Sequence, residues 1–335
     1  MPLEQRKFFK ITVVIPTYNS EPRLEKCLKL IRENNYPQDM IEIIVADGNS
    51  QDGTIEIAKK YNCVIINNER RLSEPGKGIG IANASGEIIC FIDDDNFLED
   101  KDFFKKMIEP FYDNEIVVAE PWEYTYKTEL MPLQRYWALM GINDPVVYFM
   151  GCYDRRNVLT GKWTSLKIEE EDKGNYVKFK VNFSNLPTIG ANGFMVRTEV
   201  IRKTNYMQLL DLDKVAEMVK LGYNCFAKVK CGIVHTYAPD LKSYIKKSIR
   251  KARSFYGEVT YSGQEAREKT ERIYKYPNFK YGILKFSLST FFLIPLLIDS
   301  IRLWIKTKDL EASFIHIPVC WVTLIIYAAK ILRLF

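Results

Sequence analysis

The first hundred residues alternate short apolar runs with segments that repeat apolar side chains at helical spacing. The run ITVVIP, residues 11–16, is rich in β-branched side chains, which is typical of a strand buried on both faces. Residues 23–34 place Leu24, Leu28 and Ile31 on one face of a helix. Strands separated by helices favour βαβ units, so we expect an α/β fold with a mainly parallel sheet.

Three of the expected strands run into polar segments, namely PTYN at 16–19, DGNSQDGT at 47–54 and DDDN at 93–96. The carboxyl ends of parallel strands meet at one edge of a sheet, where ligands bind. Three adjacent carboxylates repel one another unless positive charge neutralises them. Carboxylate oxygens suit Mg²⁺ or Mn²⁺, which commonly bridge protein and phosphate groups. The sequence therefore predicts a divalent cation and a bound diphosphate at this edge.

Two common nucleotide-binding motifs do not fit the sequence. No GxGxxG follows the first strand, and GxxxxGK[ST] does not occur. The segment GKGIG at 76–80 is rich in glycine, but we expect it outside a strand–turn–helix context. A dinucleotide site or a P-loop is therefore disfavoured.

The motifs VVIPTYN, ADGNSQDGT, ANASGE and FIDDDN, in this order and spacing, resemble the family 2 glycosyltransferases of GT-A (Rossmann-like) fold. The resemblance runs from about residue 11 to residue 235 and is most specific over the first hundred residues. It implies a nucleotide-diphospho-sugar donor, a divalent metal and transfer with inversion at the sugar carbon.

The same resemblance implies a set of donor-binding residues: Pro16, Thr17, Tyr18, Asp47, Lys77, Asp93 and Asp94. In this set the segment PTY lines the base pocket, Asp47 contacts the base, and Asp93 lies near the ribose. Asp94 is the variable middle member of the DxD motif, and Asp95 binds the metal. Lys77 is expected in the loop before ANASGE, where it approaches the donor or is simply solvated.

The second half of the resemblance implies an acidic pair before a helix and a histidine further along the chain. In LLDLDKVAEMVKLGY, residues 209–223, Asp211 takes the position of the family's aspartate, and Leu210 replaces the glutamate. An inverting transfer needs a carboxylate that takes the proton of the acceptor hydroxyl, and we expect Asp211 to be this base. Asp213 is the second candidate, and a helix N-cap is the structural alternative for either. His235 is implied to contact the metal or the diphosphate, and a packed position at a strand end is its alternative.

Many membrane-bound polysaccharide synthases of this family carry QxxRW after the acidic pair. Here the segment QEARE stands at residues 264–268, without the tryptophan. We therefore expect one sugar to be transferred per encounter, and not processive synthesis.

Two apolar segments close the sequence, at 286–305 and at 312–329. About twenty apolar residues span a bilayer, so we expect a two-helix membrane hairpin, with interfacial helices as the rival and a buried core pair third. The first segment spans only if Asp299 and Arg302 pair or lie near the interface.

Residues 241–280 hold eleven Lys and Arg against four Glu, a local surplus of +7 that exceeds the net charge of +6 of the whole chain. This block favours an anionic membrane surface, with a solvated helix face as the alternative. Nucleic acid is disfavoured because no binding motif accompanies the block. The amino-terminal sequence lacks a signal-peptide pattern, so we expect the catalytic part to face the cytoplasm.

We therefore expect a catalytic domain at 1–240, a basic amphipathic segment at 241–280, and two transmembrane or interfacial helices at 281–335. The expected function is inverting transfer of one sugar to a membrane lipid or lipid-linked glycan. One rival is a nucleotidyltransferase, although PTYNSEP after the first strand has no glycine. A catalytically inactive scaffold that binds nucleotide sugars is the other rival.

Overall fold

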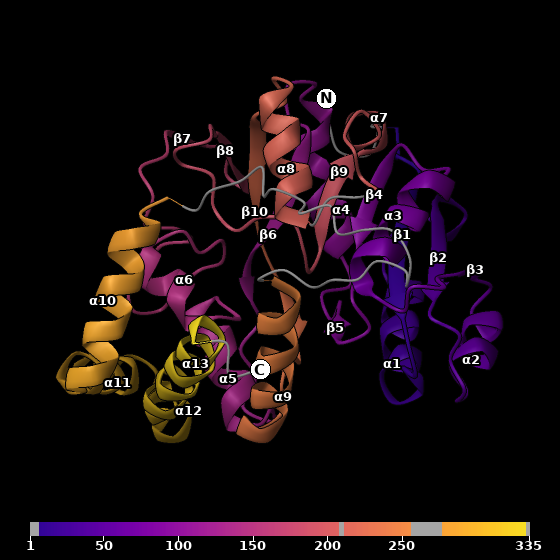
Figure 1. The fold of residues 1–335 in the computed structure, drawn as a ribbon. Helices are drawn as coiled ribbons and strands as arrows, with labels where there is room; N and C mark the ends of the chain where they lie inside the picture. Colours follow the sequence, from indigo (N-terminus) through magenta and orange to yellow (C-terminus); the bar gives the residue numbers. More distant parts are fainter. Residues whose placement is uncertain (1–6, 208–210, 256–276, 333–335) are drawn as a thin grey trace. The chain divides into compact units, whose positions relative to one another are not determined.

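The computed structural model describes residues 7–207, 211–255 and 277–332 (Figure 1). The chain divides into two compact units. The first unit comprises Met1–Trp122, Ile168–Phe183 and Ile189–Val234. The second unit comprises Glu123–Lys167, Ser184–Thr188 and His235–Phe335. The chain therefore enters each unit more than once, which the sequence did not reveal.

One mixed sheet, in the order β3-β2-β1-β4-β9-β6-β10-β8-β7 with β5 paired to β10, organises the first unit. The first four strands are parallel, as predicted, and β9 joins β4 in the antiparallel sense. The strands are β1 (Ile11–Thr17), β2 (Ile41–Asp47), β3 (Val64–Asn67), β4 (Ile88–Phe91), β5 (Asn96–Phe97), β6 (Val118–Tyr124), β7 (Glu170–Asp172), β8 (Tyr176–Lys180), β9 (Phe194–Arg197) and β10 (Cys225–His235).

The helices of the first unit are α1 (Glu21–Arg32), η2 (Gln38–Met40), α2 (Thr54–Lys60), α3 (Ser73–Asn83), α4 (Phe103–Ile108), η3 (Glu109–Tyr112), α7 (Thr198–Ile201) and α8 (Asp211–Lys220). Helix α1 buries the face predicted from its spacing, including Leu24, Leu28 and Ile31. The fold therefore confirms the α/β prediction for this part of the chain.

The segment GKGIG lies inside α3, which packs on β1 and β2. A Cβ atom on Gly80 would lie 2.2 Å from Cγ1 of Val14, and one on Gly76 would lie 2.9 Å from Nδ2 of Asn68. These glycines therefore let α3 approach the sheet closely, and they do not form a phosphate-binding loop. The close approach also turns Lys77 inward.

The second unit is helical: α5 (Pro132–Met140), α6 (Pro145–Met150), α9 (Leu241–Phe255), α10 (Phe279–Phe292), α11 (Ile294–Thr307), α12 (Leu310–Phe314) and α13 (His316–Ile331). Trp137 packs in one hydrophobic cluster with Leu303 and Val319. Phe149 packs in a second cluster with Phe286. The carboxy-terminal helices thus share their core with residues from the middle of the chain. The predicted boundaries at 240 and 280 stay predictions.

The predicted pair of carboxy-terminal helices is divided into four helices in the structure. Helices α10 and α11 meet at a bend of 88°, so 286–305 is not one straight helix. Asp299 and Arg302 pair at 3.3 Å, which is one of the two conditions stated above for the first segment to span. Within the described ranges, Leu310–Ile331 is the one helix that is long and apolar enough to cross a membrane, with mean hydropathy 1.8, and 39% of its apolar window is buried in the protein.

Candidate active site

The carboxyl ends of β1 and β2 bring Thr17 and Asp47 together, because the two residues are partners in the parallel register. The Thr17 hydroxyl donates to Oδ1 of Asp47 at 2.9 Å. Ser50 donates to the same carboxylate through its hydroxyl at 2.6 Å and through its backbone N–H at 2.8 Å. Asp47 is therefore buried and held rigidly at the edge of the sheet. Its neighbour Tyr18 is exposed, with the guanidinium of Arg71 5.5 Å from the centre of its ring.

The acidic cluster lies just beyond β4, in a turn closed by the Asn96 N–H donating to the Asp93 carbonyl at 2.9 Å. Asp95 is 8% exposed, and Nδ2 of Asn96 donates to its Oδ1 at 3.2 Å. Asp94 forms an ion pair with Arg23 of α1 at 2.7 Å. Part of the positive charge that the sequence called for is thus supplied by the protein, and a role of Asp94 in donor binding stays a prediction.

Lys77 joins the acidic cluster to the predicted base. Its ammonium group lies 2.5 Å from Oδ2 of Asp211 and 3.9 Å from Oδ1 of Asp93. Lys77 is only 2% exposed, which contradicts the solvated alternative, and it belongs to α3 and not to a loop. The fold therefore brings three predicted site residues from separate parts of the chain to one place.

Two further charged residues complete this cluster. Lys214, one turn into α8, lies 3.5 Å from Oδ1 of Asp211 and 3.5 Å from Oε2 of Glu74. The carboxyl groups of Glu74 and Asp211 thus share the ammonium group of Lys214. We refer to Glu74, Lys77, Asp211 and Lys214 as the α3–α8 cluster. Sequence reasoning missed Glu74 and Lys214, although the spacing of three between Asp211 and Lys214 on a helix was a usable signal.

The charges of the α3–α8 cluster keep Asp211 ionised. Burial would raise the pKa of Asp211, but Lys77 and Lys214 outweigh burial and lower that pKa below its ordinary value. Burial would also lower the pKa of Lys77, but the neighbouring carboxylates, Asp211 foremost, raise it. Asp211 stands at the amino terminus of α8, where the helix dipole favours negative charge. The arrangement can thus present an ionised carboxylate beside Asp93.

The other candidate base, Asp213, is buried two residues further along α8. Asp211 forms ion pairs with Lys77 and Lys214. This placement supports Asp211 as the base, and the assignment stays a prediction.

His235 is the last residue of β10 and is buried. Its ring centre lies 5.1 Å from that of Tyr124 and 5.6 Å from that of Tyr237. These contacts agree with a packed position at a strand end. His235 and Asp95 belong to different units, so a metal shared by the two stays a prediction.

The predicted metal ion would have few ligands from the protein. Within the described ranges, no group of three or more His, Cys, Asp or Glu could hold a metal ion. Asp93 and Asp95 are nevertheless hard oxygen donors on one short turn, and Mg²⁺ characteristically takes one or two carboxylates and completes its shell with phosphate and water. The residues present fit a cation of that kind bound together with a diphosphate.

Glu74 gives the site a pH dependence that can be measured. Burial and, second, the Asp211 carboxylate raise the pKa of Glu74 from 4.5 to about 7, against the two lysines. The folded state therefore holds the Glu74 proton more tightly than the unfolded state. The stability that this proton gives is complete below pH 4.5 and is lost as the pH rises through about 7.

We expect Glu74→Gln to reduce the loss of stability between pH 4.5 and 8, on the order of 1 kcal/mol or more, because the amide does not titrate in this range. Thermal unfolding across this pH range measures the effect. Glu56→Gln, which removes an exposed carboxylate on α2, is the matched control and should retain the wild-type pH dependence. Identical pH profiles for Glu74→Gln and the wild type would contradict the prediction.

Comparisons with known proteins identify the family to which the chain belongs. The model of the family "Glycosyl transferase family 2" matches residues 12–204, more than half of the chain. A protein of Methanococcus voltae named dolichyl N-acetyl-alpha-D-glucosaminyl phosphate 3-beta-D-2,3-diacetamido-2,3-dideoxy-beta-D-glucuronosyltransferase is 24% identical, over 92% of this chain and 91% of its own length.

Other relatives match only in part. Glycosyltransferase AglE of Haloferax volcanii is 35% identical over 91 residues, 25% of this chain and 30% of AglE. The GalNAc(5)-diNAcBac-PP-undecaprenol beta-1,3-glucosyltransferase of Campylobacter jejuni is 32% identical over 96 residues, 27% of this chain and 30% of that enzyme. The matched segment thus spans less than a third of the length of each of these two relatives.

Among solved structures, the mannosyltransferase PcManGT of Pyrobaculum calidifontis, in complex with GDP-Man and Mn²⁺, has the same fold with a TM-score of 0.53 at 13% identity. The match covers 97% of this chain and 91% of PcManGT. The mixed sheet with its parallel half is that of the GT-A fold. From the family match over residues 12–204, the chain belongs to the family 2 glycosyltransferases and is a glycosyltransferase enzyme.

Proposed function

We propose that this enzyme is membrane-associated and metal-dependent, and that it transfers one sugar, with inversion, from a nucleotide-diphospho-sugar to a lipid or lipid-linked glycan. The observation that carries the proposal is the position of Asp211, which is kept ionised by Lys77 at 2.5 Å while Lys77 also lies 3.9 Å from Asp93. A proton acceptor and a donor-binding carboxylate are thus joined through one buried cation.

Each predicted residue has a definite task in this proposal. Pro16, Thr17 and Tyr18 line the base pocket at the end of β1, Asp47 at the end of β2 contacts the base, and Asp93 lies near the ribose. The acceptor hydroxyl gives its proton to Asp211 as its oxygen attacks the sugar carbon. The bond between that carbon and the diphosphate breaks with its electron pair on the departing nucleoside diphosphate. Lys77 is placed to hold Asp211 in position before this step.

Asp95, with His235 as the second predicted ligand, would hold Mg²⁺ or Mn²⁺. A cation bound there supplies positive charge to the diphosphate as it departs. The Mn²⁺ named with PcManGT supports the proposal of metal dependence.

The proposed acceptor rests on the names of two relatives and on the positive charge of residues 241–280. The name of the Methanococcus voltae enzyme includes the lipid group dolichyl, and that of the Campylobacter jejuni enzyme includes the lipid undecaprenol. The surplus of +7 at residues 241–280 suits an anionic membrane, with the catalytic part on the cytoplasmic side. The missing QxxRW supports transfer of a single sugar per encounter.

A donor screen tests the proposal directly. The full chain is incubated with UDP-, GDP- or dTDP-sugars, with Mn²⁺, Mg²⁺ or a chelator, and with membrane lipids. We expect metal-dependent transfer from one class of donor to lipid, with an inverted anomeric configuration in the product. Release of pyrophosphate would instead indicate a nucleotidyltransferase. Donor binding in calorimetric titration without any turnover would indicate an inactive scaffold.

A further inference from the structure

Helices α10 and α11 form an elbow, the residues 286–298 on either side of the 88° bend at Leu293. This stretch contains no charged residue until Asp299. Its tip is strongly exposed, with Phe291 at 68% and Ile294 at 66%. Large aromatic and aliphatic side chains are thus exposed together around the bend between α10 and α11, which the surface of a soluble protein rarely shows.

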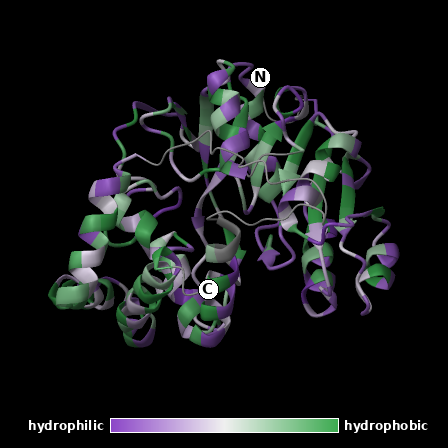
Figure 2. Cartoon of the chain, in the orientation of Figure 1, coloured by the Kyte–Doolittle hydropathy of each residue, from purple (hydrophilic) through white to green (hydrophobic). Residues whose placement is uncertain are grey.

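Helix α11 is apolar on the side that faces away from the protein. Its exposed large apolar side chains recur at helical spacing: Ile294, Leu297, Ile298, Ile301, Trp304 and Ile305. Its buried side carries Leu296, Ser300 and Leu303. A helix on a water-facing surface shows the opposite arrangement, with polar residues outward. Figure 2 shows green, hydrophobic stretches along α10 and α11.

Basic side chains flank the elbow on both arms. Lys280 and Lys285 are exposed on α10, and Arg302 and Lys306 are exposed on α11. The cations therefore lie to both sides of an uncharged tip along the chain. This order matches a leaflet of a bilayer, since apolar side chains enter the acyl region while lysine and arginine reach anionic headgroups.

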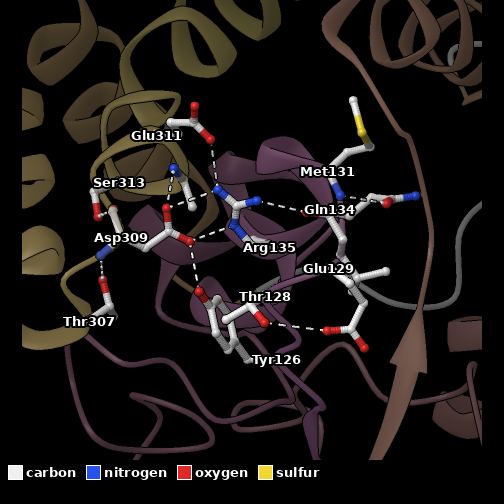
Figure 3. Close-up of polar contacts among 12 residues, drawn as sticks. Tyr126, Thr128, Glu129, Met131, Gln134, Arg135, Thr307, Asp309, Glu311 and Ser313 are labelled. Carbon is white, nitrogen blue, oxygen red and sulfur yellow. Dashed lines mark hydrogen bonds and ion pairs between the residues drawn. The ribbon is translucent and has the colours of Figure 1, made fainter.

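The turn between α11 and α12 is fixed to the start of the helical unit. Asp309 accepts hydrogen bonds from Nε of Arg135 at 2.6 Å and from the hydroxyl of Tyr126 at 2.9 Å (Figure 3). Tyr126 follows the end of β6 by two residues. Lys306 also donates to the carbonyl groups of Val158 and Leu159. A membrane hairpin would place this turn across the bilayer from β6, which these bonds do not permit.

Helix α13 is the remaining candidate for a membrane-spanning helix, but the charged helix α9 packed against it disfavours a position in the bilayer. It packs along α9, where the hydroxyl groups of Tyr244 and Thr323 lie 2.6 Å apart. Helix α9 exposes Lys242, Lys246 and Arg250 at a spacing of four. A spanning α13 would bring this row of cations into the hydrocarbon, where charged side chains are strongly disfavoured.

We propose that the α10–α11 elbow inserts into one leaflet of an anionic membrane and that no part of Phe279–Ile331 crosses the bilayer. The inference rests on the proposed membrane association and fixes its form. Each helix of the elbow has 14 residues, so its length of about 21 Å is too short for a core of about 30 Å. The enzyme would thereby face its lipid-linked acceptor from one side of the membrane.

Thiol labelling in inverted membrane vesicles, with the cytoplasmic face outward, tests the topology. Leu310→Cys reports on which side of the membrane the turn lies. Leu221→Cys, in the first unit, reports on the side of the catalytic part. Both positions are exposed. The wild type sets the background, because its described cysteines are buried except for the half-buried Cys63. We expect a membrane-impermeant maleimide to label both variants equally in intact vesicles. Labelling of Leu310→Cys only after permeabilisation would establish the hairpin and overturn the proposal.

Vesicle flotation tests the elbow itself. The variant Phe291→Ser/Phe292→Ser/Ile294→Ser should lower partition of the full chain onto phosphatidylcholine–phosphatidylglycerol vesicles by about tenfold or more. Ile325→Ser/Ile331→Ser on α13, also exposed, is the matched control and should float as the wild type does. Vesicles of phosphatidylcholine alone should bind the wild type more weakly.

Flotation of the elbow variant equal to that of the wild type would overturn the insertion. A wild type that does not float but forms dimers, which the elbow variant abolishes, would assign the surface to a second copy of the chain. Donor hydrolysis in detergent, measured in parallel for every variant, separates failure of this inference from failure of the proposed function.

Discussion

Asp211→Asn should lower turnover by about 10²-fold or more while donor affinity persists, because the amide keeps the shape of the carboxylate but cannot take a proton. In the structure Asp211 is held ionised by Lys77 and Lys214, which is the state a base requires. Initial rates with the donor identified by the screen give the turnover number. Calorimetric titration of the same donor with Mn²⁺ gives the affinity.

Asp213→Asn is the comparison variant for this experiment. Asp213 is buried on α8, two residues after Asp211. Near-normal turnover of Asp211→Asn together with a large loss in Asp213→Asn would move the base to Asp213. A large loss of donor affinity in Asp211→Asn would show that the residue acts in binding, through its ion pair with Lys77.

Asp95→Asn should weaken Mn²⁺-dependent donor binding by about 100-fold or more, since it removes a charged oxygen ligand and even outer-shell changes at metal sites cost 10- to 100-fold. The fold should survive, because removal of one crowded carboxylate relieves repulsion, and the melting temperature without metal should stay equal or rise. Titration with and without metal, and thermal unfolding of the metal-free protein, measure the two effects.

Asp94→Asn is the matched control for this second prediction. Its carboxylate pairs with the half-exposed Arg23 at 2.7 Å, a surface contact worth at most about 1 kcal/mol. We expect Asp94→Asn to lose much less Mn²⁺-dependent donor affinity than Asp95→Asn. Unchanged affinity of Asp95→Asn in the presence of Mn²⁺ would exclude Asp95 as the metal ligand. An equal loss in both variants would place Asp94 in the donor site as well.

The sequence by itself determined the parallel half of the sheet and the edge that carries the site. The apolar runs of β1, β2 and β4 predict their burial, and the spacing of apolar residues in α1 predicts its buried face. The register that joins Thr17 to Asp47 follows once two such strands lie parallel. These features are local, because the period of a strand or helix depends only on neighbouring residues.

The tertiary structure decided which distant charges meet and how the carboxy-terminal helices lie. Lys77 and Asp211 are 134 positions apart, and Arg135 and Asp309 are 174 positions apart, so no local pattern links them. Apolar content predicted helices after residue 281, but the same content suits a span, an interfacial elbow or a core. The bend between α10 and α11 and the bonds of Asp309 support the proposed interfacial elbow, because only the folded chain shows which side of each helix is buried and which polar groups fix its ends.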